Sequence, residues 1–310
     1  MTPRRTAAVV VTWQGGTVTD RCVASLLASD APPDAVWVVD NASGAAERAR
    51  LAARWGGTPA VRLLFLDDNR QFAGGMNAGA AAALAAGAER ILFLNNDTVL
   101  APDALRLLGA ALDAAPDAGI AGPLVRDLAA PARVLSAGER HSLPLLCIPR
   151  TLLRPRRTTG GPHAVDGIMG CAMLVTRACY QAVGGYAEDI AVYYEDVDFC
   201  LAARGRGFRL LLVPAASVLH DGLRGFAAGL TPWAAYLKAR NPWLLLRRRG
   251  TPATWVAFVP TYAAMLAASA ALYALRGERA VVRALGRGAR AGVRIALGGT
   301  PEPVAAPERA

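Results

Sequence analysis

The feature that most constrains the fold is a fourfold alternation of short apolar runs with segments of helical periodicity. The apolar runs occupy residues 7–12, 36–39, 61–66 and 91–94. Continuous apolar character over so few residues predicts strands buried on both faces, as in a parallel sheet. Segments with apolar residues at helical spacing, such as 18–29 and 45–55, separate these runs. The alternation therefore predicts a doubly wound α/β half within about the first 126 residues.

Polar residues follow the predicted strands at their carboxyl ends, and they include Thr12, Asp40, Asn69 and Asp97. The carboxyl ends of parallel strands lie along one edge of the sheet, and ligands of open α/β sheets bind outside that edge. We therefore expect these four residues to converge on a nucleotide site. A Gly-rich segment at 74–79 is expected to open a helix, whose free N–H groups favour a phosphate, although it matches neither GxGxxG nor a P-loop.

The sequence Asn95-Asn96-Asp97-Thr98 directly follows the fourth predicted strand. A lone carboxylate among oxygen donors suits a hard cation, Mg²⁺ or Mn²⁺, whose remaining ligands are substrate phosphates and water. The alternative is that the segment only turns the chain before a helix that begins near Pro102. Both interpretations fit this segment taken alone.

The second half of the chain contains a cluster of carboxylates at Glu195, Asp196 and Asp198. Three such groups repel one another unless a helix N-terminus, a cation or a proton offsets their charge. One interpretation is a helix cap with a first-turn acid, and the other is a general base aimed at a hydroxyl nucleophile. Strands are predicted at 165–175, 208–213 and 218–220, and the last ends in His220. A lone histidine is more often structural than a ligand.

The net charge of +10 is carried by the last quarter of the chain. Residues 1–223 hold 21 Arg and 21 acidic residues, whereas 224–310 hold thirteen basic residues against three Glu. A basic segment attached to a neutral body indicates an anionic partner surface, either a membrane or a nucleic acid. The tail lacks nucleic-acid-binding motifs, so a membrane is the favoured partner and no nucleic acid is expected.

The tail pairs a charge-free run at 250–275 with regularly spaced arginines, namely Arg276, Arg279, Arg283, Arg287, Arg290 and Arg294. This spacing predicts one basic face on an amphipathic helix. Pro252 and Pro260 are expected to interrupt the apolar run, and arginine on both flanks argues against a simple crossing. We expect residues 241–297 to associate peripherally or re-entrantly with an anionic membrane; self-association into a homo-oligomer is an alternative use of this helix.

The five cysteines include no CxxC pair, and the N-terminus lacks the apolar core of a signal peptide. Both features are typical of a protein with reduced thiols on the cytoplasmic side of the cell. Together with the basic tail, they predict a location at the inner face of the cell membrane.

Taken together, these segments resemble family-2 glycosyltransferases of the GT-A fold, close to the bacterial rhamnosyltransferase-like branch. The resemblance covers about residues 7–221 and rests on the order and spacing of several motifs. These are VVTWQ at 10–14, VVDNAS at 38–43, NRQFAGGMNAG at 69–79, LNNDT at 94–98, VGGY at 183–186, YYEDVDFC at 193–200 and VPAASVLH at 213–220.

The resemblance implies a Rossmann-like, mostly parallel mixed sheet in a catalytic domain at 1–225, with an acceptor half at about 164–225 and a helical basic extension at 226–310. It also implies inverting transfer of a sugar from a nucleoside diphosphate to a hydroxyl. The implied donor-binding residues are Thr12, Trp13, Asp40, Asn41, Asn69, Phe72, Ala73, Gly74, Asn77, Asn95 and Asn96. The implied acceptor region is Gly167, Met169 and Gly170.

By the same resemblance, Asp97 and His220 bind the divalent metal, and Asp196, or alternatively Glu195, is the catalytic base. The leading donor is dTDP-rhamnose, and the leading acceptor is a lipid-linked or cell-envelope glycan. The alternatives are a transferase for UDP-hexose or galactofuranose and, from another class, a non-catalytic scaffold that binds nucleotide sugars.

Four positions depart from the family pattern, and they bear on the donor more than on the reaction. Gln14 stands where Asn is usual, Gln71 where Gly is usual, and Ala187 where Asp often follows the Gly-Gly-aromatic turn. Asn95 replaces the first acid of the metal-binding motif.

Overall fold

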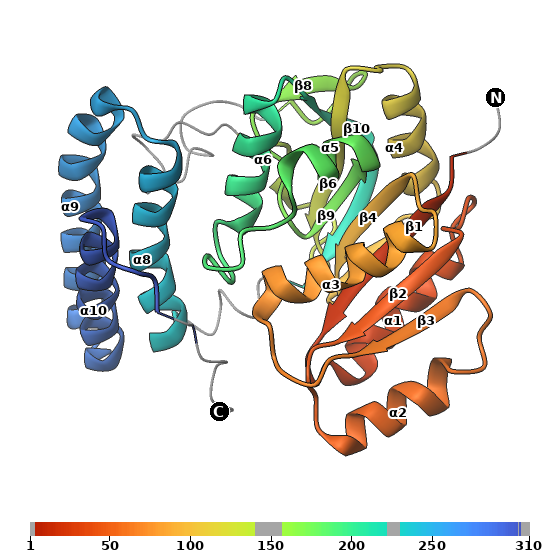
Figure 1. Cartoon of the computed structure of the whole chain (residues 1–310), viewed down its shortest axis with the longest axis horizontal. Helices are drawn as coiled ribbons and strands as arrows, with labels where there is room; N and C mark the ends of the chain where they lie inside the picture. Colours follow the sequence, from red (N-terminus) through yellow and green to blue (C-terminus); the bar gives the residue numbers. More distant parts are fainter. Residues whose placement is uncertain (1–3, 140–156, 222–229, 303, 305–310) are drawn as a thin grey trace.

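The computed structural model describes residues 4–139, 157–221, 230–302 and 304, and a sheet of ten strands forms the centre of this part of the chain (Figure 1). In chain order the strands are β1 (Thr6–Thr12), β2 (Ala35–Asp40), β3 (Val61–Phe65), β4 (Arg90–Asn95), β5 (Thr98–Leu100), β6 (Ala118–Asp127), β7 (Val134–Ser136), β8 (His163–Val165), β9 (Ala172–Thr176) and β10 (Arg209–His220).

The sheet has the order β3-β2-β1-β4-β9-β6-β10-β5, with β7 added to β6 and β8 to β10. The pairings among β1, β2, β3 and β4 are parallel, and so is the long pairing of β6 with β10. β9 runs antiparallel to both β4 and β6. The mixed α/β sheet predicted from the sequence is therefore confirmed.

Helices cover both faces of this sheet. They are α1 (Gly16–Leu27), α2 (Ala45–Trp55), α3 (Gln71–Ala85), α4 (Ala104–Asp113), α5 (Arg177–Val183) and α6 (Glu195–Gly205). Buried residues of α1, α2 and α4 share one core with the sheet, and those of α3, α5 and α6 share a second core on the opposite face. This two-layered burial explains why the central strands are apolar along their whole length.

The glycines at 74–79 do not open a helix, because α3 already begins at Gln71. Their role in the described structure is close packing of α3 against the sheet. A Cβ at Gly79 would lie 2.4 Å from Val9 Cγ1, and one at Gly75 would lie 2.9 Å from Val11 Cγ1. The expectation of a Gly-rich phosphate loop at these positions is therefore wrong, and the N-terminus of α3 lies further back along the chain.

The strands of the second half differ from the predictions in their boundaries, and one central strand was not predicted. The predicted strands at 208–213 and 218–220 form one strand, β10, with an irregularity between Val213 and Ser217. The predicted strand at 165–175 is divided between β8 and β9. The strand β6 was not predicted, although it pairs with both β9 and β10 in the centre of the sheet.

Three further helices, α8 (Pro232–Arg249), α9 (Pro252–Leu275) and α10 (Arg279–Ala296), form a layer beside the α/β body (Figure 1). In this view α8 lies between α6 and the outer helices α9 and α10. Glycines let α10 approach α8 closely. A Cβ at Gly288 would lie 2.2 Å from Tyr236 O, and one at Gly292 would lie 2.3 Å from Trp243 Cδ1. The predicted boundary at 225 falls in 222–229, outside the described residues, and the division into two domains stays a prediction.

The two proline positions in the apolar run do not break it. Pro252 occupies the first turn of α9, where its missing N–H costs nothing, and Pro260 lies inside a continuous helix. Within the described residues, α9 is long and apolar enough to cross a membrane, and only 11% of its most apolar window is buried. Arg276 caps α9 and so lies outside α10, which carries the other five arginines.

The segment 241–297 is not uniformly exposed. Residues of α8 from Asn241 to Leu246 are buried, whereas α9 and α10 expose large apolar side chains, including Val256, Leu275 and Val293. The exposed large apolar side chains of 241–297 that the structure describes therefore lie on α9, on α10 and at Leu297 just after it. Of the five cysteines, Cys22, Cys171, Cys179 and Cys200 are buried free thiols, and Cys147 lies outside the described residues.

Candidate active site at the carboxyl edge of the sheet

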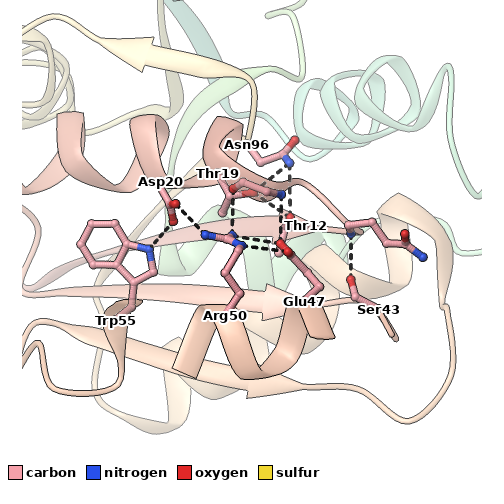
Figure 2. Close-up of polar contacts among 10 residues, drawn as sticks. Thr12, Thr19, Asp20, Ser43, Glu47, Arg50, Trp55 and Asn96 are labelled. Atoms are coloured by element: carbon pink, nitrogen blue, oxygen red, sulfur yellow. Dashed lines mark hydrogen bonds and ion pairs between the residues drawn. The ribbon is translucent and has the colours of Figure 1, made fainter. Parts of the chain in front are cut away.

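The ends of β1, β2 and β4 meet at one edge, as the strand pattern predicts. Thr12 and Asp40 are paired in register, and Asn41 N donates to Thr12 O at 2.8 Å. The Thr12 hydroxyl lies 2.8 Å from Thr19 Oγ1, and Asn96 Nδ2 donates to both hydroxyls at 3.3 and 3.2 Å (Figure 2). Thr12 therefore ties β1 and α1 to the loop after β4.

The end of β2 is joined to the start of α3 by amide side chains. Asn41 Oδ1 accepts from Arg70 N at 2.9 Å, and Asn41 Nδ2 donates to Asn69 Oδ1 at 3.2 Å and to Gln71 O at 2.9 Å. Asn69 Oδ1 also accepts from Gln71 N at 2.9 Å. The two asparagines thus fix the backbone that leads into α3.

Asp40 is almost fully buried, and only one of its carboxylate oxygens is occupied. Oδ2 accepts from Arg48 Nε at 3.1 Å and from Ser43 N at 3.2 Å. Oδ1 is buried and accepts no hydrogen bond within the described part of the chain. A buried carboxylate oxygen without a donor is costly, so this atom is a candidate ligand contact.

A second polar cluster, formed by Asp20, Glu47, Arg50 and Trp55, supports the loop between β1 and α1 (Figure 2). Arg50 Nη1 pairs with Asp20 at 2.6 Å, and Arg50 Nε pairs with Glu47 at 2.8 Å. Glu47 Oε1 in turn accepts from Gly16 N at 3.0 Å, and this carboxyl's pKa is lowered, chiefly by its hydrogen bond from Arg50. Sequence reasoning missed this cluster, whose one local signal is the i,i+3 spacing of Glu47 and Arg50.

Asp97 and His220 are brought together by the pairing of β5 with β10. His220 is opposite Thr98 in this antiparallel pair, and Asp221 N donates to Asp97 O at 3.1 Å. His220 Nε2 lies 3.2 Å from Asp97 Oδ1, yet this buried oxygen accepts no hydrogen bond of acceptable geometry in the described residues. The sequence motif and the distant histidine are therefore parts of one site, although 123 positions separate them in the chain.

The donor set at Asp97 fits a divalent cation that is shared with a ligand. A carboxylate oxygen and a neutral imidazole nitrogen are suitable ligands for Mn²⁺ or Mg²⁺, and the oxygen has no competing donor. Within the described residues, no group of three or more His, Cys, Asp or Glu side chains is placed to hold a metal. Among the described residues, Asp97 and His220 would supply two ligands, and a substrate and water could supply others.

Of the acids at the start of α6, Asp196 is held by a different segment, the one that leads into β9. Asp196 Oδ2 accepts from Gly170 N at 2.8 Å, and the approach is close because a Cβ at Gly170 would lie 2.8 Å from Asp196 Cβ. Glu195 is buried, and its Oε2 accepts no hydrogen bond in the described structure. Burial, and secondarily the charge of Asp196, raise the pKa of Glu195 well above its usual value. Asp198 is ion-paired with Arg249 Nε at 2.7 Å, so its charge is satisfied by α8.

Six non-glycine residues with a left-handed backbone surround the site. Gln14 follows β1, Ala42 follows β2, and Gln71 begins α3. Ala191, Tyr193 and Tyr194 immediately precede α6, with φ angles of 66°, 63° and 73°. Such angles cost about 1–3 kcal/mol each for residues with a Cβ, and they gather at functional sites where the surrounding structure enforces them.

The remaining candidate residues fall into two groups. Asn77, Phe72, Ala73 and Gly74 lie on α3 against the segment after α5. Asn77 Nδ2 donates to Tyr186 O and to Glu188 Oε1, each at 2.9 Å, and the Phe72 ring meets Tyr186 edge-on. The amide of Asn77 is thus committed to this contact.

The second group lies on the strand ends and on the segment that leads to β9. Asn95 N donates to Cys171 O at 3.0 Å, and Gly167 pairs with Glu139 through the backbone. Met169 O accepts from Ala172 N at 3.3 Å. Trp13, at the end of β1, is partly exposed.

The model of the family described as "Glycosyltransferase like family 2" matches residues 3–245. The dTDP-rhamnosyl transferase RfbF of Shigella flexneri is 26% identical over 227 residues, which are 70% of this chain and 72% of that protein. An N-acetylglucosaminyl-diphospho-decaprenol L-rhamnosyltransferase of Mycobacterium tuberculosis is 29% identical over 252 residues, and the match covers 75% of this chain and 80% of that protein.

Among solved structures, the mannosyltransferase PcManGT of Pyrobaculum calidifontis, in complex with GDP-Man and Mn²⁺, superposes with a TM-score of 0.59. It is 20% identical, and the match covers 96% of this chain and 88% of that one. This likeness supports the GT-A fold. The chain therefore belongs to glycosyltransferase-like family 2, and it is a glycosyltransferase with the GT-A fold.

Proposed function

We propose that this glycosyltransferase moves a sugar from a nucleoside diphosphate to an acceptor hydroxyl, with inversion at the anomeric carbon. The observation that carries the proposal is the pairing of Asp97 with His220 at the same sheet edge as Asp40 and Asn96. In open α/β sheets a nucleotide binds outside this edge. The second acid, Asp196, is held on a different element, as a base separate from the leaving group requires.

In this proposal the buried edge residues hold the nucleotide. Asp40 Oδ1, which lacks a donor among the described residues, accepts from the base or ribose. Thr12, Asn41, Asn69 and Asn96 hold each other in place and so fix the shape of the pocket before the donor arrives. Such preorganisation lowers the entropic cost of binding and orients the reacting bond.

Asp97 and His220 would hold the divalent cation. When bound, that cation offsets the negative charge that develops on the diphosphate leaving group. PcManGT was solved with Mn²⁺ and a nucleotide sugar, which supports a metal in proteins of this fold. The pairing of β5 with β10 sets the position of both side chains, so the protein contributes a fixed pair of ligands to a shared site.

Asp196 is the proposed base. Its Oδ2 is oriented by Gly170 N, in the segment that we expect to contact the acceptor. A hydroxyl is a poor nucleophile at neutral pH, so a positioned carboxylate that takes its proton accelerates transfer. Glu195 is the weaker candidate, because burial and the charge of Asp196 raise its pKa and so disfavour the charged form that a base requires.

The names of the relatives suggest the substrates. Two of them are named as rhamnosyltransferases, one for dTDP-rhamnose and one for a diphospho-decaprenol acceptor. We therefore propose dTDP-rhamnose as the donor and a lipid-linked or cell-envelope glycan as the acceptor, with UDP-hexose or galactofuranose as the alternative donor class.

A membrane-bound acceptor would account for the exposed apolar and basic side chains of the outer helices, α9 and α10. α9 exposes Val256, Val259, Leu272 and Leu275, and the neighbouring α10 carries five arginines. An apolar surface beside cationic side chains matches the boundary between anionic headgroups and acyl chains. We propose that α9 and α10 hold the enzyme on the inner face of the cell membrane, with the site on the cytoplasmic side.

The donor assignment is tested by thermal unfolding of the purified protein with Mn²⁺ and, separately, dTDP-rhamnose, UDP-galactose, UDP-glucose and GDP-mannose. A donor at 100 times its Kd adds about 2.7 kcal/mol of stability, which raises the Tm by several degrees. We expect dTDP-rhamnose to give the largest rise and Asp97→Asn to abolish it. The control, Asp103→Asn, removes a carboxylate just beyond β5 and should keep the rise.

If no nucleotide sugar raises the Tm, the proposed function is wrong. Protection without any sugar transfer over a panel of lipid-linked acceptors would instead favour the scaffold function.

The protonation of Glu195 predicts a pH-dependent stability. In the folded protein its pKa lies above that of the unfolded chain, so between these values the folded state binds one more proton. Stability then falls as the pH rises from about 4.5, by up to about 1.4 kcal/mol per unit. Glu195→Gln removes this slope. The free energy of unfolding of the variant, measured in urea, should therefore rise relative to that of the wild type as the pH increases.

The same variant addresses which acid is the base. Glu195→Gln should keep most of the transfer activity, whereas Asp196→Asn should lower kcat by about 100-fold or more. Parallel unfolding curves for wild type and Glu195→Gln across pH 5–8, or the reverse order of the two activities, would contradict this assignment.

Membrane association is tested by sedimentation with vesicles of pure phosphatidylcholine and with vesicles that also contain phosphatidylglycerol. Each arginine near an anionic surface contributes about 1 kcal/mol, so Arg283→Gln with Arg287→Gln should weaken partitioning about 30-fold. The control pair, Arg62→Gln with Arg106→Gln, changes the α/β half by the same charge. Equal losses for both pairs, or no preference for the anionic vesicles, would refute the surface on α9 and α10.

A further inference from the structure

We propose that Arg240 and Asn241 of α8 are positioning residues, which hold the turn at Asp189–Tyr194 and thereby place the base on α6. This inference rests on the proposed function and extends it to a helix outside the nucleotide-binding half. The turn leads directly into Glu195 and Asp196, so its backbone sets where these two acids stand.

The turn requires support because three of its residues adopt left-handed backbone angles. Ala191, Tyr193 and Tyr194 all carry a Cβ, and their φ angles lie between 63° and 73°. Tyr194 is also the N-cap of α6, and the first-turn N–H of Val197 is accepted at 2.8 Å by Asp196 Oδ1, not by the N-cap residue. Contacts with the rest of the protein must therefore offset the strain of this turn, since strained segments persist only when their surroundings enforce them.

Asn241 supplies that enforcement. Its Nδ2 donates to three carbonyl oxygens of the turn, those of Ile190, Val192 and Tyr193, at 2.9–3.0 Å. The side chain is fully buried, so water cannot replace these bonds. One amide group thus contacts three of the six carbonyls of the turn, and one of its two hydrogens is shared between two of them.

Arg240 fixes the orientation of this amide. Arg240 Nε donates to Asn241 Oδ1 at 2.9 Å, which leaves Nδ2 to face the turn. Arg240 Nη2 also donates to Asp189 O at 2.6 Å. The guanidinium is almost fully buried, and burial lowers its pKa from the ordinary value. Burying a guanidinium costs free energy unless it is hydrogen-bonded, and the bonds of Arg240 to Asn241 and to the turn offset part of that cost.

The turn also contacts the donor side of the site. Ala73 N, in the first turn of α3, donates to Ala191 O at 2.9 Å. The same six-residue turn therefore touches α3, precedes the base on α6 and is held by α8. A shift of the turn changes the distance between base and donor without removing any group that binds the nucleotide. α8 is tied to α6 a second time by the pair between Arg249 and Asp198.

The test is Asn241→Asp, which keeps the volume and shape of the side chain but replaces the donor N–H groups by an oxygen. Three carbonyls would then face a carboxylate. We expect kcat for transfer to fall about 100-fold, as for a displacement of about 1 Å near the reacting atoms. The Kd of the donor, measured by titration with Mn²⁺ present, should change less than about threefold.

The control is Leu246→Ala, a fully buried position on the same helix that packs with Phe258 of α9. It removes packing of α8 but no contact of the turn, so it should lower the Tm at least as much as Asn241→Asp while keeping kcat within about threefold. A second readout is amide hydrogen exchange across 189–198, which should accelerate in Asn241→Asp and stay unchanged in Leu246→Ala.

The outcomes separate this inference from the proposed function. If the wild type transfers sugar and Asn241→Asp keeps its kcat, the inference is overturned and the function stands. The inference also fails if both variants lose kcat in proportion to their Tm, or if donor affinity falls together with kcat. A wild type that transfers no sugar overturns both, and unchanged exchange at 189–198 overturns the inference without reference to activity.

Discussion

The structure depends on a left-handed backbone at one edge of the sheet. Gln14, Ala42 and Gln71 adopt it after β1, after β2 and at the start of α3, and Ala191, Tyr193 and Tyr194 adopt it before the acids of α6. Each such angle costs about 1–3 kcal/mol, which the rest of the fold must offset. Asn41 holds the start of α3 through Arg70 and Gln71, and Asn241 holds the turn before α6 through three carbonyls. Two buried amides thus stabilise the most strained parts of the chain.

The left-handed backbone gives a physical reason for the residues that are usual at two positions where this chain departs from the family pattern. Gln14 stands where Asn is usual and Gln71 where Gly is usual, and both have positive φ angles, of 54° and 57°. Asn and Gly tolerate such angles better than Gln does. The two glutamines therefore adopt angles that suit the usual residues better. The sequence shows only that these positions depart from the pattern, and the reason for the usual residues is visible in the backbone angles.

Local patterns were sufficient to predict the first half of the fold. Apolar runs and helical spacing predicted β1 to β4 and α2, because these elements are buried in the way their sequences suggest. β6 was missed because Pro123 and two glycines obscure its pattern, and its pairing with β9 and β10 is entirely long-range. α3 was placed too late because its glycines resemble a loop, although they serve close packing against Val9 and Val11.

The sequence could predict where the candidate residues lie, but it could not predict the side chains that support them. The strand ends predicted that Thr12, Asp40, Asn69 and Asp97 share one edge of the sheet, and the resemblance alone proposed roles for His220 and Asp196. The spacing of Arg50 indicates its partner Glu47 but not Asp20, which is 30 positions away in the chain. Nothing local to Asn241 indicates what it holds, because its partners are distant backbone carbonyls. A side chain whose partners are backbone carbonyls requires no particular residue type at those positions, so the sequence shows no recognisable pattern. The helices after β10 illustrate this, because their composition predicts a membrane surface whereas α8 faces the catalytic half.

The central claim is that Asp97 and His220 share a divalent cation with the diphosphate of the donor. It is tested most directly by the Kd of Mn²⁺, measured by electron paramagnetic resonance with and without dTDP. Two protein ligands bind Mn²⁺ weakly, so the account predicts that dTDP tightens Mn²⁺ binding at least tenfold, with the reciprocal effect on dTDP, and that Asp97→Asn removes this coupling. An Mn²⁺ affinity that is unaffected by dTDP, or a coupling that survives Asp97→Asn, would contradict it.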